Sequence, residues 1–433
     1  MAKPVGAACN LACHYCYYHK PQHGVMDMHT LERYIQQYIA MQTTGHVLFT
    51  WHGGEPMLRP LSFYRKALEL QRKYADGRIV ENCIQTNGTL LTPEWCQFLH
   101  DNHWLVGISI DGAQDMHDAF RVKSHESRVE SQEVKTLPFS KGESPKGEGV
   151  CSESRAGNQE EIDCPPARGG LPEGLRGGSR LEGACDTGSW HKVMQGIHML
   201  DRYGVEWNAM ATVHAANVLR PLDFYHFFKD IGCHYLQFTP IVESDGQHVL
   251  PMAVKPDEWG NFLCAIFDEW VRHDVGKTFV QIFDATLANW LGVTPGLCTL
   301  AAECGHAGVI EANGDVYSCD HFVFPEHRLG NIHSDTLINM MYGEQQSRFS
   351  AKKTLELPDQ CRQCRWLFAC HGECPKNRIK VKSHNTQCSM FNVQCSPYLC
   401  SGYRHFFSHV APAMDIMAAL YRQGKAPAEI MNL

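Results

Sequence analysis

The distribution of cysteine constrains this chain most. The sequence holds 20 cysteines in 433 residues, three of them between positions 9 and 16 and half of them between positions 298 and 400. The first residues, MAKPVGAACN, contain no apolar run like that of a signal peptide, so we expect the protein in the cytoplasm, where thiols stay reduced. Clustered thiols in that compartment usually bind metal. The pattern therefore predicts metal centres.

Length and charge narrow the possible functions. A chain of this length has room for two or three domains. Lys and Arg number 39 against 47 Asp and Glu, a net charge of −8, which argues against a nucleic-acid partner. No window approaches the roughly 18 apolar residues of a membrane helix. We therefore expect neither a nucleic acid nor a membrane as partner.

Residues 1–240 alternate short apolar runs with amphipathic segments, which predicts repeated βα units and a parallel sheet or barrel. A first strand would have to fit within residues 2–7, and whether the N-terminus is complete stays open. The predicted strands are residues 47–51, 79–85, 105–110, 205–213 and 235–239. The predicted helices are residues 31–41, 63–74, 93–102, 190–203 and 221–231.

Composition divides the rest of the chain. Residues 123–188 are rich in Ser, Glu, Gly and Pro and are expected to form a flexible insertion, whose three cysteines we leave unassigned. Residues 241–297 read as a helical connection. Residues 298–400 show little apolar periodicity, which indicates a domain folded around metal. Residues 401–433, with a helix at 411–424, form a C-terminal cap.

The first cysteine group, CNLACHYC, places Cys9, Cys13 and Cys16 on one loop after the first strand. Three thiolates would leave one iron of a four-iron cube open to another ligand. Zinc, with His14 or His19 as fourth ligand, is the competing interpretation. An open iron is useful at the C-terminal mouth of a β/α barrel, where loops carry the chemistry. We therefore favour an iron–sulfur cluster.

The spacing CxxxCxxC, with an aromatic residue before the last cysteine, resembles the signature of the radical S-adenosylmethionine superfamily. The resemblance implies an α/β fold, a partial (β/α)6 barrel, in which S-adenosylmethionine binds the open iron. It also implies cofactor contacts from Tyr15, from Gly54 in the GGEP segment, and from Ser109, Arg121 and Leu236. Taken alone, these residues would be a turn glycine, a turn serine, a surface arginine and a core leucine.

Eight further cysteines make two complete sets of four thiolates, which zinc ribbons could also use. Their order resembles a SPASM domain, which holds two auxiliary [4Fe-4S] clusters. The resemblance implies one cluster on Cys298, Cys304, Cys319 and Cys374 and another on Cys361, Cys364, Cys370 and Cys388. Cys395 and Cys400 fall outside the pattern, and an exchange with Cys388 stays open. The chain would then hold three [4Fe-4S] clusters.

Asp320 directly follows Cys319, and an aspartate there is most simply a solvated or capping residue. The sequence DVYSCD, however, is similar to the anaerobic sulfatase-maturating enzymes, in which this aspartate accepts a proton. That resemblance implies oxidation of a Cys or Ser side chain of an unfolded sulfatase to Cα-formylglycine. It also implies an external electron donor such as flavodoxin or ferredoxin.

Two alternatives remain from the sequence. One is another SPASM enzyme that modifies peptides by forming thioether or carbon–carbon crosslinks. The other is a zinc-binding scaffold or electron carrier without catalysis. The sequence does not distinguish Cys from Ser as the target.

Overall fold

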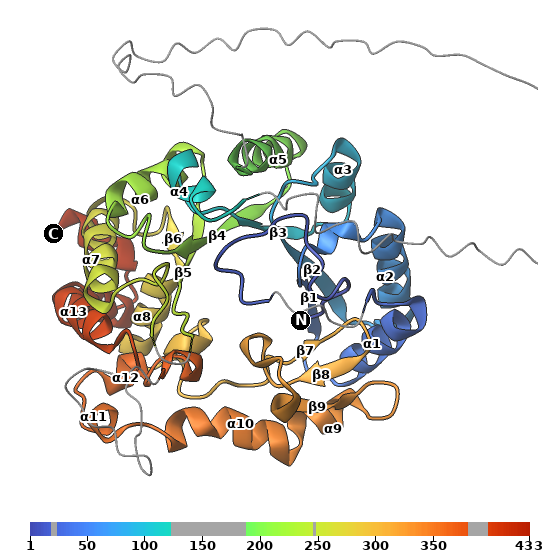
Figure 1. Ribbon diagram of the computed structural model, residues 1–433. Coiled ribbons are helices and arrows are strands. Elements are labelled where there is room, and N and C mark those ends of the chain that lie inside the picture. Colours follow the sequence, from blue (N-terminus) through green and yellow to red (C-terminus); the bar gives the residue numbers. More distant parts are fainter. Residues whose placement is uncertain (19–23, 123–187, 246–247, 380–396) are drawn as a thin grey trace, which may run out of the picture. The chain divides into compact units, whose positions relative to one another are not determined.

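Two sheets organise the computed structural model, which describes residues 1–18, 24–122, 188–245, 248–379 and 397–433. The larger sheet has six strands in the order β1-β2-β3-β4-β5-β6, every neighbouring pair parallel. Figure 1 shows helices on the outside of this sheet, as expected for a partial β/α barrel. Its strands are β1 His46–Trp51, β2 Ile79–Thr86, β3 Leu105–Ser109, β4 Trp207–Val213, β5 Tyr235–Pro240 and β6 Phe279–Val280.

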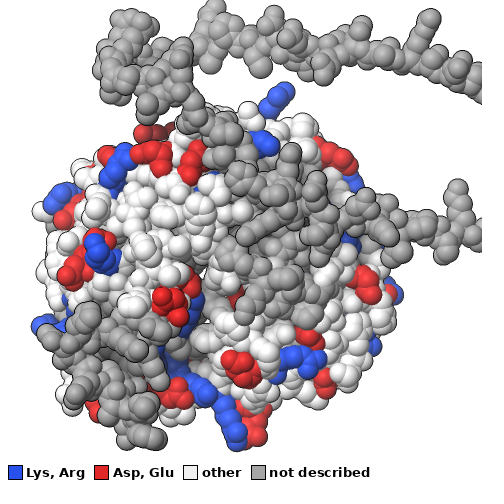
Figure 2. All heavy atoms as spheres, viewed as in Figure 1, with Lys and Arg blue, Asp and Glu red and all other residues white. Residues whose placement is uncertain are grey.

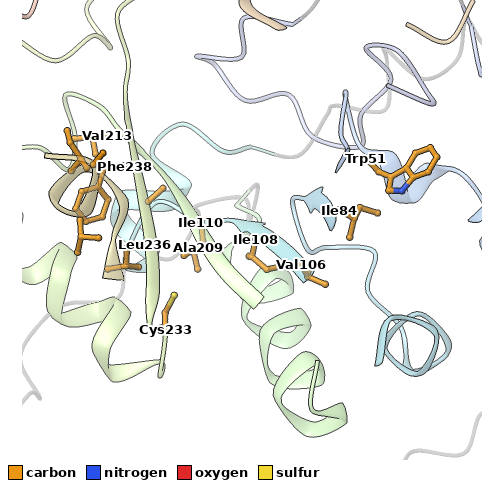
Figure 3. Close-up of a cluster of buried hydrophobic side chains, with 14 of the residues drawn as sticks. Trp51, Ile84, Val106, Ile108, Ile110, Ala209, Val213, Cys233, Leu236 and Phe238 are labelled. Carbon is orange, nitrogen blue, oxygen red and sulfur yellow. The ribbon is translucent and has the colours of Figure 1, made fainter. Parts of the chain in front are cut away.

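The two faces of this sheet differ in polarity. On the face covered by helices, side chains such as Trp51, Ile108 and Val213 are fully buried (Figure 3). The opposite face, which we call the inner face, carries the alternate residues of each strand, because successive side chains point to opposite sides. These residues are half-buried and mostly polar: Thr50, Cys83, Gln85, Ser109, Asn208, Met210 and Gln237.

The helices around the sheet begin and end where the sequence signals them. The Thr92 side chain accepts a hydrogen bond from the backbone N–H of Trp95, and Pro93 occupies the first turn of α3. Gly204 ends α5 in the left-handed conformation. The helices are α1 Met28–Ala40, α2 Leu61–Tyr74, α3 Pro93–Asp101, α4 Gln114–Asp118, α5 Trp190–Tyr203, α6 Pro221–Asp230, α7 Pro256–His273 and α8 Gln281–Leu291.

The expected parallel α/β architecture is confirmed, and the expected strands agree with the observed ones within a few residues. The sheet also extends past residue 240, because β6 lies in the segment interpreted as a connection. With only two residues, β6 is too short to show strand periodicity. The expected flexible insertion lies almost wholly outside the described residues.

The second sheet is antiparallel, in the order β7-β8-β9, with strands β7 Val309–Ile310, β8 Asp315–Tyr317 and β9 Arg328–Asn331. Its strands have two to four residues each, and none of them was predicted from the sequence. The helices that follow are α9 Leu337–Tyr342, α10 Glu344–Leu355, α11 Asp359–Arg362, α12 Leu367–Cys370 and α13 Cys400–Arg422. Helix α13 begins well before the expected residue 411.

The N-terminal residues join the two sheets. Ala2 forms parallel bridges with both Trp51 of β1 and Ile310 of β7. The Ala2 amide donates to the Thr50 carbonyl at 2.9 Å, and the Lys3 amide donates to the Ile310 carbonyl at 2.9 Å. The expected first strand is thus reduced to a single bridging position.

The face of the molecule drawn in Figure 2 shows no large patch of one charge among the described residues. Acidic and basic side chains are interspersed over the described residues on the face drawn in Figure 2. Among the helices of the described segments, none is long and apolar enough to cross a membrane.

Helices α7 and α13 pack closely at two glycines, and this contact can be tested. A methyl group added at Gly402 would lie 2.1 Å from the carbonyl oxygen of Pro256. We expect Gly402→Ala to destabilise the protein by about 1–3 kcal/mol through overpacking. Thermal unfolding under anaerobic conditions would show this as a lower Tm. His405→Ala, at an exposed site on the same helix, should leave the Tm nearly unchanged and serves as the control.

Candidate functional site

Most of the expected site residues of the first half lie where the parallel strands end, whereas Leu236 is the second residue of β5 and lies near its start. The segments after β1, β2, β3 and β4 begin with His52, Asn87, Ile110 and His214, all at one edge of the sheet. The loop that carries Cys9, Cys13 and Cys16 lies against this edge. Asn87 Nδ2 donates to Cys9 Sγ at 3.8 Å, and the amide of His14 donates to the carbonyl of Phe120. This is the edge at which β/α barrels place their chemistry.

The three loop thiols are largely buried. Burial raises the pKa of Cys9 to about 12 and that of Cys13 to about 11, and it also raises the pKa of Cys16. The thiols are thus protonated without a ligand, and metal binding would release protons. Three sulfur donors on one loop are a donor set that suits iron–sulfur ligation.

The GGEP segment packs against the backbone that leads into the cysteine loop. The Gly54 amide donates to the Gly6 carbonyl at 2.7 Å, and a side chain at Gly54 would collide with the Ala8 carbonyl oxygen, 2.0 Å away. The Glu55 carboxylate is fully buried and accepts from the amides of Met57 and Asn87. Gly54 is therefore required for the close approach of two backbones.

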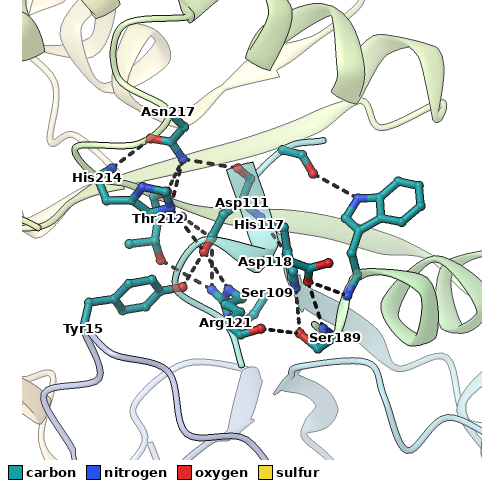
Figure 4. Close-up of polar contacts among 12 residues, drawn as sticks. Tyr15, Ser109, Asp111, His117, Asp118, Arg121, Ser189, Thr212, His214 and Asn217 are labelled. Atoms are coloured by element: carbon teal, nitrogen blue, oxygen red, sulfur yellow. Dashed lines mark hydrogen bonds and ion pairs between the residues drawn. The ribbon is translucent and has the colours of Figure 1, made fainter. Parts of the chain in front are cut away.

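Tyr15 and Arg121 meet at one buried carboxylate, that of Asp111 (Figure 4). Arg121 Nε donates to Asp111 at 2.7 Å and one Nη donates at 3.1 Å, while the Tyr15 hydroxyl donates to the same carboxylate. The Thr212 amide donates to it at 2.8 Å. Burial alone would raise the pKa of Asp111, but the Arg121 guanidinium outweighs burial and lowers it. Contact between Arg121 and a cofactor carboxylate would extend or compete with this ion pair.

Ser109 and Leu236 lie on opposite faces of the sheet. Ser109 is on the inner face, where its hydroxyl accepts a hydrogen bond from Gln85 Nε2 at 2.9 Å. Leu236 is 2% exposed and belongs to the helix-covered core (Figure 3). Only the backbone of Leu236 is therefore able to face a ligand on the inner side.

Asp320 comes from the second sheet but contacts the first cysteine loop. It opens a short 3-10 helix, Asp320–Phe322, directly after Cys319. The Tyr17 hydroxyl, one residue past Cys16, donates to its carboxylate. Lys3 Nζ lies 2.5 Å from Asp320 Oδ1, and the Lys3 side chain is fully buried. Burial raises the pKa of Asp320, but Lys3, together with His52 and His321, outweighs this effect and holds the pKa well below its usual range.

Sequence reasoning missed the residues that hold Asp320. Lys3 Nζ also lies 3.4 Å from the ring centroid of Tyr18, a cation–π distance. The Tyr18 hydroxyl donates to Glu311, next to β7. Tyr17 and Tyr18 follow the cysteine motif directly, and that proximity was the available signal. Lys3 carries no signal in the sequence, since only the bridge at Ala2 brings it here.

Four cysteines of the second half lie together as the resemblance implies. The thiols of Cys298, Cys304 and Cys374 influence one another electrostatically, and Cys319 interacts with Cys298 and Cys374. Burial raises the pKa of Cys319 to about 12 and that of Cys374 to about 11.

A second set lines a cavity of about 430 Å³. The cysteines in its wall are Cys361, Cys364, Cys370 and Cys400. Cys400, the first residue of α13, interacts electrostatically with Cys361 and Cys370. Cys388, which the resemblance implied as the fourth ligand, lies outside the described residues, and so does Cys395.

The cysteine sets are not arranged around single ions. Within the described segments, no three His, Cys, Asp or Glu side chains lie close enough to hold one metal ion. A zinc site needs its four donors around one centre, whereas a four-iron cube takes its thiolates at separate corners. The wide cavity between the cysteines suits the larger group.

Comparisons with known proteins agree with this geometry. The radical SAM superfamily model matches residues 4–133, and the model of an iron-sulfur cluster-binding domain, SPASM, matches residues 302–365. A serine-type anaerobic sulfatase-maturating enzyme from Bacteroides thetaiotaomicron is 49% identical over 456 aligned positions, which cover 100% of this chain and 94% of the relative.

More distant relatives also match along their whole length. A cysteine-type anaerobic sulfatase-maturating enzyme from Clostridium perfringens is 26% identical, with 96% of each chain covered. The solved structure of native anSMEcpe with bound AdoMet and Cp18Cys peptide matches with a TM-score of 0.74 and 26% identity, over 96% of this chain and 98% of that one. With the cysteine loop, the auxiliary cysteine sets and Asp320 all present, this chain belongs to the anaerobic sulfatase-maturating enzymes of the radical SAM superfamily.

Proposed function

We propose that this protein oxidises a serine side chain of an unfolded sulfatase polypeptide to Cα-formylglycine. The observation that carries the proposal is the contact of Asp320 with Tyr17, which brings a carboxylate from the second sheet to the first cysteine loop. The preference for serine rests on the serine-type relative at 49% identity, against 26% for the cysteine-type one.

Three [4Fe-4S] clusters fit the cysteine sets. The ligands would be Cys9, Cys13 and Cys16 for the first cluster, and Cys298, Cys304, Cys319 and Cys374 for the second. For the third we propose Cys361, Cys364, Cys370 and Cys400, since Cys400 lines the same cavity as the other three. Bound S-adenosylmethionine and these clusters supply a 5′-deoxyadenosyl radical and an acceptor for one electron.

The residues of the barrel edge would hold the cofactor and the peptide. We propose that the cofactor contacts are made by Tyr15, Gly54, Ser109, Arg121 and the backbone of Leu236. Arg121 and Asp111 form a buried ion pair that fixes the loop carrying Tyr15. Such a fixed shell restricts the positions available to the substrate hydrogen.

We propose Asp320 as the acceptor of the substrate proton. Oxidation of the serine CH–OH group removes a hydrogen atom from carbon, a proton from oxygen and one further electron. Bound S-adenosylmethionine would supply the acceptor for the hydrogen atom, and a bound auxiliary cluster would supply the acceptor for the electron. The proton goes to Asp320, which Lys3 keeps ionised in spite of burial.

The remaining partners follow from this chemistry. Reduction of the first cluster requires an external donor, such as flavodoxin or ferredoxin, in a reducing compartment, which supports a cytoplasmic location. We retain the boundaries 1–240, 241–297, 298–400 and 401–433 as the proposed division of the chain, with the barrel strand β6 inside the second segment.

Peptide masses test the proposal directly. Protein reconstituted anaerobically with iron and sulfide is given reductant, S-adenosylmethionine and sulfatase-motif peptides that contain Ser or Cys. We expect the Ser peptide to lose two hydrogens faster than the Cys peptide exchanges sulfur for oxygen. Release of 5′-deoxyadenosine with both peptides unmodified would contradict sulfatase maturation by this protein.

The role of Lys3 can be tested by measuring whether cofactor cleavage still leads to formylglycine. Because Lys3 holds the Asp320 carboxylate, we expect Lys3→Met to resemble Asp320→Asn. Both variants should still release 5′-deoxyadenosine, with formylglycine per deoxyadenosine falling at least tenfold, and Lys3→Arg should recover part of that yield. Iron content serves as the control for folding, with exposed Lys66→Met as the matched variant. An unchanged ratio in Lys3→Met would remove Lys3 from the reaction.

The choice between Cys400 and Cys388 is testable by metal analysis. We expect Cys400→Ala to lose about four irons per chain and the matching absorbance, because it removes a cluster ligand. Cys388→Ala should keep the full iron content. The opposite pattern would return the ligand role to Cys388.

A further inference from the structure

Lys353, on α10, is a fully buried lysine beside the auxiliary cysteines. Its ammonium donates to the carbonyl oxygens of Cys298, at 2.6 Å, and Thr299, at 2.9 Å. Within the described segments, no carboxylate lies within 4.0 Å of this nitrogen. A buried ammonium without a counter-charge is strongly unfavourable, and neutral carbonyls compensate it only in part.

The charges around Lys353 are mainly sulfur. The cysteines that interact with its ammonium electrostatically are, in decreasing order, Cys304, Cys298, Cys374 and Cys370. The first three belong to the set Cys298, Cys304, Cys319 and Cys374, and only Cys370 belongs to the other set. An anionic cluster on the first set would therefore be the nearest strong counter-charge.

Other ionisable groups nearby do not replace that counter-charge. Glu373 is buried next to Cys374, but its carboxylate accepts a hydrogen bond from Asn377 Nδ2 and forms no ion pair with the Lys353 ammonium in the described segments. Arg378 adds a second positive charge, with one Nη donating to the Lys353 carbonyl at 2.8 Å. His371 is also close enough to interact with Lys353. Lys353 and Arg378 thus place two positively charged side chains beside the first set.

We propose that Lys353 is the counter-charge of the cluster held by Cys298, Cys304, Cys319 and Cys374, and that it raises the reduction potential of this cluster. A fixed positive charge stabilises the reduced, more negative state more than the oxidised state. The cluster that Lys353 faces would therefore accept the electron from the substrate more readily. This inference rests on the proposed ligand set and does not depend on the identity of the peptide.

Redox titration followed by electron paramagnetic resonance tests the proposal without any peptide. The full chain is reconstituted with its first cysteine loop changed to alanine, which leaves only the auxiliary clusters. We expect Lys353→Met to lower the midpoint potential of one auxiliary cluster, so that its reduced-to-oxidised ratio at a fixed potential falls at least tenfold, or 59 mV for one electron. Loss of the shifted signal in a Cys304→Ala background identifies the cluster.

Lys352→Met is the matched control, since Lys352 is the exposed neighbour on the same helix and should leave both potentials unchanged. An unchanged potential in fully loaded Lys353→Met would overturn the proposal. If Lys353→Met fails to load iron, Lys353→Arg decides. A loaded cluster near the wild-type potential supports a role of charge, whereas loss of the cluster or a tenfold shift contradicts it.

The failure of this inference can be distinguished from the failure of the proposed function. A shifted potential together with unmodified peptides would leave the role of Lys353 intact and reject only sulfatase maturation. Wild-type protein that binds no auxiliary cluster would reject the ligand set, and the inference with it.

Discussion

The backbone bridge at Ala2 is the contact on which the arrangement of the site depends. It pairs with β1 of the parallel sheet and with β7 of the antiparallel sheet, so two cysteine-bearing regions far apart in sequence share one strand position. The same backbone segment leads into the loop of Cys9, Cys13 and Cys16. The geometry between the first cysteine loop and Asp320 is therefore fixed by hydrogen bonds that involve no metal. The Asp320 carboxylate, which we propose as the proton acceptor, therefore needs no cofactor to reach its position, which is the condition for electrostatic preorganisation.

The polar inner face of the parallel sheet is the surface that would bind the cofactor and the substrate. The fully buried apolar side chains of the parallel sheet lie on its helix-covered side, and the alternate positions carry mostly polar groups such as Gln85, Ser109 and Asn208. A filled barrel interior would leave no room for a nucleoside and a peptide. In this partial barrel, successive side chains of each strand point to opposite faces. The residues that stabilise the core therefore differ from the residues that are available to bind a ligand. Leu236 illustrates the separation, because its side chain serves the core while its backbone borders the site.

Local patterns predicted the fold well, and long-range contacts explain what they missed. Alternation of short apolar runs and amphipathic segments located five strands, because each buries one face. Strand β6 was missed since two residues carry no periodicity, and the early start of α13 was missed since its first turn holds Cys400 and Gly402 in place of an apolar stripe. The cysteine motifs predicted three groups of thiols, two of which lie together in the described residues as far as those residues extend, but spacing alone did not choose between Cys388 and Cys400, because that choice depends on how α13 returns to the cavity. The burial of Lys3 and Lys353 could not be predicted from the sequence, because no local pattern distinguishes a buried lysine from an exposed one.

Lys3 and Lys353 would each balance one of the charges that the proposed reaction produces. Oxidation of an alcohol to an aldehyde releases protons and electrons in the protein interior, where separated charge is costly. Lys3 holds Asp320 as a carboxylate, and this makes Asp320 a weaker base but ensures that it is ionised when the substrate proton must leave. Lys353, which contacts the carbonyl of Cys298, would offset the negative charge that arrives with the electron. Asp320 and the cluster ligand Cys319 are neighbours in sequence, so proton and electron would leave the substrate toward adjacent residues, each with its own buried ammonium. Such a short separation of charge costs less than a long one and keeps both transfers within one rigid segment.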